Sequence, residues 1–287
     1  MILIGTSGYS FPDWVGPFYP RGTESRQMLG FYVRHFATVE VNSTYYRIPP
    51  PSTLAAMDAK TPPGFEFVIK ANQEMTHARS LDRKLYDAFL RSIEPLRVSG
   101  KLSGVLAQFP YAFQRSVEGQ GLLHSMRERI TEIPLFVEFR HSSWVDDETF
   151  RFLEREGIGY VSVDEPDLPG LMPPVARSTA DAAYVRFHGR NHANWWGSGR
   201  GSETARGDAG GGGDTPRRGG DRYDYLYSES ELREWVDRIR ELNAKTKKTF
   251  VFFNNCHVGQ AATGAKLMRR LLDLPEPIGT AEQQGFL

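Results

Sequence analysis

The sequence is poor in cysteine, the residue that builds disulfides and thiolate metal centres. Cysteine occurs once, at Cys256, which excludes an internal disulfide and any multi-cysteine zinc or iron–sulfur site. No apolar run approaches the roughly 20 residues of a membrane span. The first five residues are too short for a signal-peptide core and lack a basic start. We therefore expect a cytoplasmic protein without a membrane partner.

An excess of charge is also missing. Lys and Arg together number 35, as do Asp and Glu, so the formal net charge is zero. A generic nucleic-acid-binding protein carries a basic excess, so nucleic acid is not the favoured partner, although a local basic patch stays open. With 40% hydrophobic and 24% charged residues, the 287-residue chain has the composition of a soluble globular protein with a large core.

Short β-rich runs alternate with helical stretches along the chain. The runs are rich in Val, Ile, Phe and Tyr, as buried strands are. They cover residues 2–5, 38–42, 66–70, 104–109, 135–140, 159–164, 183–188 and 249–254. Helices are expected at 24–36, 81–98, 122–130, 146–156, from the capping box at Ser228 through about Leu242, and at 261–274. The Pro-rich segment 166–182 is expected to hold no full helix.

This alternation predicts an α/β fold with right-handed crossovers and a parallel sheet. Eight strand–helix units fit a closed (β/α)₈ barrel, which usually takes about 250 residues. An open doubly wound sheet is the alternative, but it calls for a G-x-G-x-x-G fingerprint after the first strand, which Gly5-Thr6-Ser7-Gly8 does not match. We predict one TIM-like barrel domain over residues 1–287.

Residues 197–222 interrupt the pattern. They are rich in Gly, Arg and Asp and nearly devoid of apolar residues, which predicts a flexible insertion in the loop after strand seven. Gly199-Arg200-Gly201 would suit a phosphate loop or an RNA-binding arm. It follows no strand directly and opens no helix, so we expect a solvated loop.

Polar residues gather on one side of the strands, near their C-terminal ends. Side chains alternate along a strand, so Glu138 and Arg140 face away from Val137 and Phe139. A charged pair against the helix layer would carry a large desolvation cost, which predicts that Glu138 and Arg140 point toward the barrel axis. The same end of other strands carries Glu40, Asn42, Lys70, Gln108, Asp164, Arg186, His188 and Asn254.

This end of the barrel is where barrel enzymes place their active sites. Lys70, Arg140, Arg186 and Arg190 are cationic donors, and Arg binds phosphate or carboxylate bidentately, so we expect a small anionic ligand. The candidate catalytic residues are Glu40, Glu138, Asp164 and His188, with the carboxylates as general acid or base and the histidine as a proton shuttle. A purely structural role for any single pair stays open.

Glu138, Asp164 and His188 are also ligand types for a divalent metal. The neighbouring Lys and Arg side chains would repel a cation, so a metal is the less favoured alternative and no organic cofactor is expected. Trp195 and Trp196, in the loop after strand seven, either stack a base or sugar or cover the barrel mouth.

Several motifs resemble the YecE-like family, a bacterial and archaeal domain of unknown function (number 72). They are Gly5–Tyr9 with Trp14 and Phe18–Pro20, Thr38–Arg47, Gln108–Pro110, Glu138–Trp144, Tyr184–Arg190, Tyr223–Tyr225 with Tyr227–Ser228, and Phe253–Asn255. The resemblance covers essentially the whole chain and implies a TIM-like barrel without a settled activity. Two features depart from the family pattern: the longer insertion at 197–222, and Thr263-Gly264 where an asparagine is expected.

The resemblance also implies a polar site at the barrel mouth. Its motif residues here are Glu40, Asn42, Glu138, Arg140, His141, Asp164, Arg186, His188 and Asn254. We place Ser7, Tyr9, Asn42, Lys70, Gln108, Arg140, His141, Arg186, Arg190 and Asn254 in the expected substrate-binding set.

Three functions follow as hypotheses. The first is an enzyme (hydrolase, lyase or isomerase) that acts on a phosphorylated or carboxylated substrate by acid–base chemistry. The second is a metal-dependent hydrolase or nuclease, which rests on fold-level analogy. The third is a non-catalytic module that binds a nucleotide or a nucleic-acid end.

Overall fold

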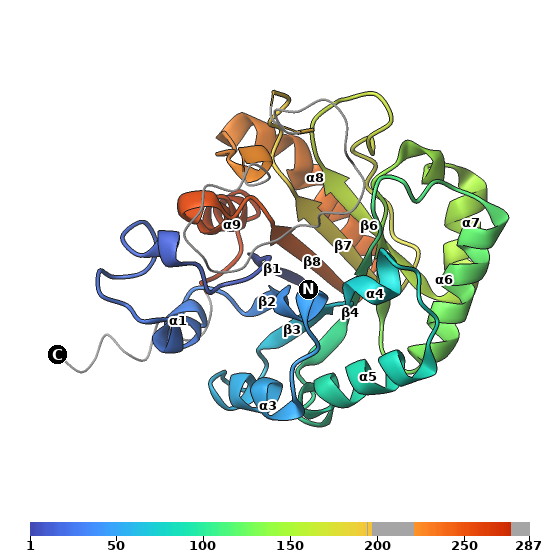
Figure 1. Ribbon diagram of the computed structural model, residues 1–287. Helices are drawn as coiled ribbons and strands as arrows, with labels where there is room; N and C mark the ends of the chain where they lie inside the picture. Colours follow the sequence, from blue (N-terminus) through green and yellow to red (C-terminus); the bar gives the residue numbers. More distant parts are fainter. Residues whose placement is uncertain (194, 197–220, 277–287) are drawn as a thin grey trace.

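Eight parallel strands form a nearly closed barrel surrounded by helices in the computed structural model of the chain (Figure 1). The structure describes residues 1–193, 195–196 and 221–276. The strands are β1 (Ile2–Thr6), β2 (Thr38–Val41), β3 (Glu66–Lys70), β4 (Leu102–Gln108), β5 (Leu135–Glu138), β6 (Ile158–Asp164), β7 (Ala182–Phe187) and β8 (Lys248–Phe253). Their order in the sheet is β1-β8-β7-β6-β5-β4-β3-β2. The predicted TIM-like barrel is thereby confirmed.

Six of the nine helices described between the strands fall on expected ranges, with shifts at their ends, whereas three lie outside them. They are α1 (Ser25–Tyr32), α2 (Ser43–Tyr46), α3 (Pro51–Ala59), α4 (Gln73–Thr76), α5 (Arg83–Val98), α6 (Val117–Arg129), α7 (Asp147–Glu156), α8 (Glu229–Lys245) and α9 (Gln260–Leu271). The expected ranges include none of α2, α3 and α4. In α3, Pro51 occupies the first helical position, where its fixed φ suits a helix start. Within the described ranges, no helix has the length and apolarity to cross a membrane.

The predicted insertion at 197–222 falls almost entirely outside the described residues. Its last two positions, Asp221 and Arg222, belong to a short 3₁₀ turn that ends at Tyr223. Segment 166–181 is described and contains no helix, as the sequence indicated.

The barrel closes where β1 meets β2. The two strands share one bridge, Ser7 with Glu40, beside which the Gly8 N–H donates to the Glu40 carbonyl at 2.8 Å. From α1, the Tyr32 hydroxyl accepts the Thr6 N–H at 2.9 Å and donates to the Thr38 carbonyl at 3.1 Å. A tyrosine hydroxyl thus supplies hydrogen bonds that a regular ladder would give, and it holds Glu40 close to the first strand.

Aromatic rings fill the barrel beneath the mouth. The Phe136 ring of β5 lies 5.0 Å from Tyr184 of β7 and 6.1 Å from Phe250 of β8, between ring centroids. A Cβ at Gly159 or Gly104, on the strands beside β5, would come within 2.5 Å of Phe136. Glycine at these positions makes room for the ring, so the charged side chains above rest on a packed apolar floor.

We predict that Gly5→Ala strains the seam between β1 and β2. A Cβ at Gly5 would stand 2.3 Å from the Thr38 carbonyl oxygen, and a backbone atom at that distance has to shift. We expect a loss of about 2–3 kcal/mol in the free energy of unfolding, measured with urea. The control is Gly121→Ala in α6, where a Cβ meets nothing within 4 Å and the helix gains up to about 1 kcal/mol. Equal effects of the two substitutions would contradict this account of the seam.

Candidate functional site

A buried arginine joins three strands across the top of the barrel. The guanidinium of Arg186, from β7, donates to Glu138 of β5 at 2.6 Å and to Glu40 of β2 at 2.6 Å. It also donates to the Ser7 hydroxyl at 3.2 Å. The Tyr184 hydroxyl completes the set by donating to the second oxygen of Glu40 at 2.6 Å. We call Glu40, Glu138, Tyr184 and Arg186 the inner network.

The inner network is almost completely buried, with Arg186 1% exposed and the other three side chains at 0%. Burial alone would raise the pKa of the Glu138 carboxyl, but Arg186 and Arg140 outweigh it and hold that pKa well below its usual range. For Arg186, burial opposes the charge, while Glu138 and Glu40 raise its pKa well above the ordinary value. The charges are therefore kept in the core by mutual pairing.

A second layer of polar side chains lies next to Glu138, toward the mouth. Arg140 contacts Glu138, Nε to Oε1, at 2.7 Å, and Glu165 at 3.3 Å. His188 brings Nε2 within 3.2 Å of the same Glu138 oxygen. Asn254 lies 3.1 Å from His188 Nδ1. We call Arg140, Glu165, His188 and Asn254 the rim.

The contacts to Glu138 Oε1 are short in distance but imperfectly aligned. Neither the Nε of Arg140 nor the Nε2 of His188 forms a hydrogen bond of regular geometry within the described chain, although both lie at ion-pair distance. The contacts of Arg140 and His188 with Glu138 Oε1 are therefore electrostatic.

Glu165 is the rim residue whose charge changes near neutral pH. Burial raises its pKa, and nearby Arg140 and the Met172 N–H only partly offset this, so the pKa of Glu165 reaches about 7. Its Oε1 accepts the Met172 N–H at 2.9 Å. Glu138 and Glu165 thus share Arg140 but differ in proton affinity, as acid–base pairs in active sites do.

His188 is neutral in this environment. Burial and the neighbouring Arg140 lower its pKa to about 3. Because Nε2 faces a carboxylate, which only accepts, we assign the proton to Nε2 and leave Nδ1 to accept the Asn254 amide. The expected role as a proton shuttle therefore lacks support from its pKa, and the ring instead positions Glu138.

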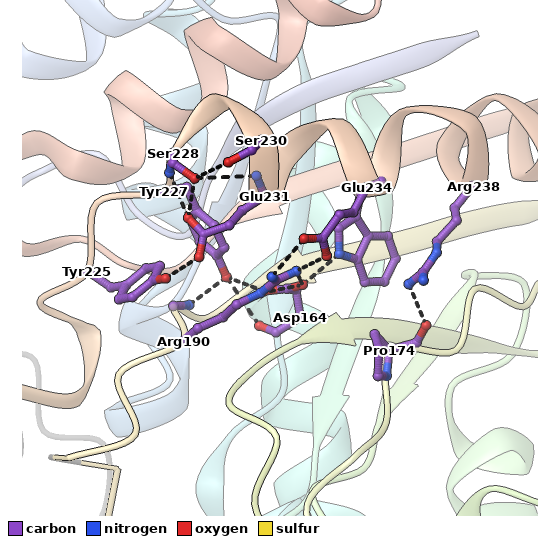
Figure 2. Close-up of polar contacts among 12 residues, drawn as sticks. Asp164, Pro174, Arg190, Tyr225, Tyr227, Ser228, Ser230, Glu231, Glu234 and Arg238 are labelled. Atoms are coloured by element: carbon purple, nitrogen blue, oxygen red, sulfur yellow. Dashed lines mark hydrogen bonds and ion pairs between the residues drawn. The ribbon is translucent and has the colours of Figure 1, made fainter.

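The expected direction of Asp164 is wrong. Its carboxylate accepts from Arg190 and from the Tyr227 hydroxyl at 2.7 Å (Figure 2). It also accepts from Trp235 Nε1 of α8 at 2.6 Å, so it faces the helix layer. Arg190, expected to bind substrate, also contacts Glu234 of α8 at 2.8 Å. These side chains tie the loop after β7 to β6 and α8. A charged side chain meets the helices here because a complete set of partners offsets its desolvation.

Sequence reasoning missed Glu165, which occupies the place expected for Asp164. Alternation along β6 continues past its end, so Glu165 falls on the same side as Val161 and Val163. Tyr160, on the other side, packs against Phe150 of α7. The apolar pair faces the axis on this strand, the reverse of β5. Extending the alternation by one residue would have found Glu165.

The remaining expected residues lie around the mouth. Val68 is in register with Glu40, and Lys70 lies two residues later on the same strand, so alternation directs the Lys70 side chain inward. The Lys70 amine lies 4.4 Å from the Tyr45 ring centroid. Gln108 pairs with Glu138 in register. His141 accepts the Ser143 N–H at 3.1 Å and packs against Tyr111.

Ser7, Tyr9 and Asn42 were also expected at the site. Ser7 contacts Arg186. Tyr9 packs against Tyr32. Asn42 has an unpartnered side-chain oxygen among the described residues. The described part of the chain contains no group of three or more His, Cys, Asp or Glu side chains arranged to hold a metal.

The comparisons with known proteins agree with this architecture. The family model "Protein of unknown function DUF72" matches residues 3–284. The chain belongs to the DUF72 family. The "UPF0759 protein YunF" of Bacillus subtilis is 36% identical and aligns over 99% of both chains. The "UPF0759 protein YecE" of Escherichia coli K12 is 28% identical over 60% of this chain and 62% of its own length.

Solved DUF72 structures share the barrel. The crystal structure of a DUF72 family protein from Thermotoga maritima has a TM-score of 0.82 and 40% identity, and covers 95% of this chain and 99% of that one. A DUF72 family protein from Enterococcus faecalis has a TM-score of 0.81 and 27% identity, with 96% of each chain covered. The resemblance to the YecE-like family is thereby confirmed.

For this DUF72 chain, we predict that Arg186→Met costs about 3–5 kcal/mol in the free energy of unfolding, because it leaves buried Glu40 without a cation and buried Glu138 with Arg140 alone. The matched control is Arg233→Met in α8. Arg233 pairs with Glu229 at 2.5 Å with both side chains more than half exposed, so its loss should stay below about 0.5 kcal/mol. Urea unfolding of both variants tests the difference, and a small loss for Arg186→Met would contradict a structural role for the inner network.

Proposed function

We propose that this protein is an enzyme that transfers a proton to or from a small anionic substrate at the barrel mouth. The main support for the proposal is that two carboxylates, Glu138 and Glu165, both contact Arg140 but differ in pKa. Glu138 has a pKa well below its usual range and stays ionised, whereas Glu165 has a pKa of about 7. At neutral pH, Glu165 is present in both forms, as a general acid or base requires.

The proposed roles differ from those that the sequence indicated. Glu165 is the proton-transferring group, and Glu138 provides a fixed negative charge beside it. Neutral His188 orients Glu138 through Nε2. Hydrolase, lyase and isomerase reactions all use such a group, and the location at the C-terminal ends of the strands is the usual one for barrel enzymes.

The balance of charge supports an anionic substrate. Lys70, Arg140 and Arg186 bring positively charged side chains to this end of the barrel. Protonation of Glu165 removes one negative charge beside Arg140. Binding of an anion should therefore be coupled to protonation of Glu165.

This coupling predicts how anion binding depends on pH. Sulfate is the probe, because it does not titrate between pH 6 and 8, and calorimetry measures its affinity. With a Glu165 pKa of about 7, the protonated fraction falls about tenfold over this range, and the affinity should fall with it. Glu165→Gln should bind sulfate with little dependence on pH.

The control is Glu128→Gln, on the exposed face of α6, whose side chain is 63% exposed. It should keep the pH dependence of the wild type. A flat profile in the wild type, or an unchanged slope in Glu165→Gln, would contradict the proposed link between Glu165 and the anion.

Turnover is tested separately. We expect the wild-type protein, incubated in D₂O with a pool of phosphorylated and carboxylated metabolites, to produce a mass change in one compound. The change is either deuterium uptake or a new product, and mass spectrometry detects it. Glu165→Gln should abolish it. Binding of a metabolite without any chemical change would instead favour the non-catalytic binding module.

A further inference from the structure

A buried amide oxygen at the mouth has no hydrogen-bond partner among the described residues. Gln108, at the end of β4, is 3% exposed. Its Nε2 donates to the Phe109 carbonyl at 2.9 Å. Its Oε1 has no hydrogen-bond partner within the described chain. Burying an acceptor without a donor costs free energy, and such a group in a native protein calls for an explanation.

The orientation of this amide is fixed by its neighbour. Exchanging the nitrogen and oxygen would bring Oε1 against the Phe109 carbonyl, so that two acceptors would meet. The Gln108 nitrogen therefore donates to the Phe109 carbonyl, and the Gln108 oxygen is the atom without a donor among the described residues. Gln108 is also in register with Glu138, whose side chain contacts Arg186 inside the barrel. The unpartnered oxygen accordingly belongs to the interior side of β4, beside the inner network.

A second unpartnered acceptor lies on a nearby strand. Asn42 follows β2, two residues after Glu40, and alternation directs it to the same side. Its Oδ1 also lacks a donor in the described part of the chain. Lys70 ends the strand between β2 and β4. This sector of the mouth thus combines two amide acceptors with one cation.

We propose that the substrate is a phosphorylated or carboxylated polyol or sugar, and that Gln108 Oε1 accepts one of its hydroxyl groups. The inference rests on the proposed function, which supplies the anionic group. An amine would also satisfy an amide oxygen, but a cationic ligand would meet the positively charged side chains of Lys70 and Arg140. A hydroxyl is a neutral donor, and it satisfies the acceptor without that repulsion.

Aromatic side chains near the mouth would suit such a ligand. Tyr111 packs edge-on against His141 and Trp196, with ring centroids 4.9 and 5.1 Å apart. Trp196 is 46% exposed. Tyr111 lies three residues beyond Gln108, and His141 follows Arg140 in the sequence. Binding sites usually combine apolar and aromatic walls with a few placed polar groups, and the carbon face of a sugar suits such a wall.

Matched pairs of anions test the role of the hydroxyl groups. The pairs are glycerol 3-phosphate with n-propyl phosphate, sorbitol 6-phosphate with n-hexyl phosphate, and gluconate with hexanoate. Calorimetry at pH 6 measures the affinity of each. At least one hydroxylated member should bind about tenfold or more tightly than its alkyl partner, because a site built to bond a hydroxyl disfavours the analogue that lacks it.

Gln108→Met tests the residue itself. Methionine has a similar length but no amide, so this variant should lose the preference for the hydroxylated member while its affinity for sulfate stays within about twofold. Its urea midpoint should change little, because the substitution removes an unpaired acceptor together with the Nε2 hydrogen bond to the Phe109 carbonyl. The control is Gln114→Met at an exposed position in the loop before α6, which should keep the preference.

The outcomes separate this inference from the proposed function. Equal affinities within all three pairs, together with normal sulfate binding, would overturn the inference and leave the proposed function standing. A preference that persists in Gln108→Met would overturn the role of Gln108. If no anion binds, sulfate included, both proposals fail. The comparison within pairs uses the wild-type protein, so it stands even if a variant does not fold.

Discussion

The bond pattern of Arg186 is the constraint on which the barrel mouth depends. One guanidinium reaches Glu40 on β2 and Glu138 on β5, and so connects strands that are not neighbours in the sheet. Removing either carboxylate would leave a buried charge uncompensated, and that cost far exceeds the value of an exposed ion pair. The strands must therefore keep the spacing that this bridge requires. The single bridge between Ser7 and Glu40 at the seam is held from both sides, by Tyr32 outside and by Arg186 inside.

The pairing inside the barrel also explains why two similar carboxylates behave differently. Glu138 contacts Arg186, Arg140 and His188, so its ionised form is favoured despite burial. Glu165 has Arg140 at 3.3 Å and one backbone N–H, which does not compensate for its desolvation, and its pKa rises to about 7. The difference follows from the number of cationic partners, since both side chains are buried. It also makes the stability of the fold depend on pH. The contribution of Glu165 is fully present below its unfolded pKa near 4.5 and is lost as the pH rises through about 7.

Most of the fold was predictable from the sequence, because strand composition and alternation are local properties. The eight strands and the inward direction of Glu40, Glu138 and Arg186 followed from them. Asp164 was misplaced because the rule that charges avoid the helix layer holds only for charges without partners there. Its partners there come from distant parts of the chain, namely Trp235, Tyr227 and Arg190. No local sequence pattern indicates that these residues contact Asp164. The pKa of Glu165 was likewise out of reach, since it depends on the burial produced by the folded chain.

The site therefore divides into a part that maintains the barrel and a part that can respond to a ligand. In the inner network, every carboxylate oxygen lies close to a cation or a hydroxyl, so it has little capacity to bind anything further. At the mouth, Glu165 can change its charge near neutral pH, and the oxygens of Gln108 and Asn42 lack donors among the described residues. A ligand that supplies negative charge and hydroxyl groups would complement both features at once. The inner network fixes the positions of these groups without competing for the ligand, because its own charges already compensate one another.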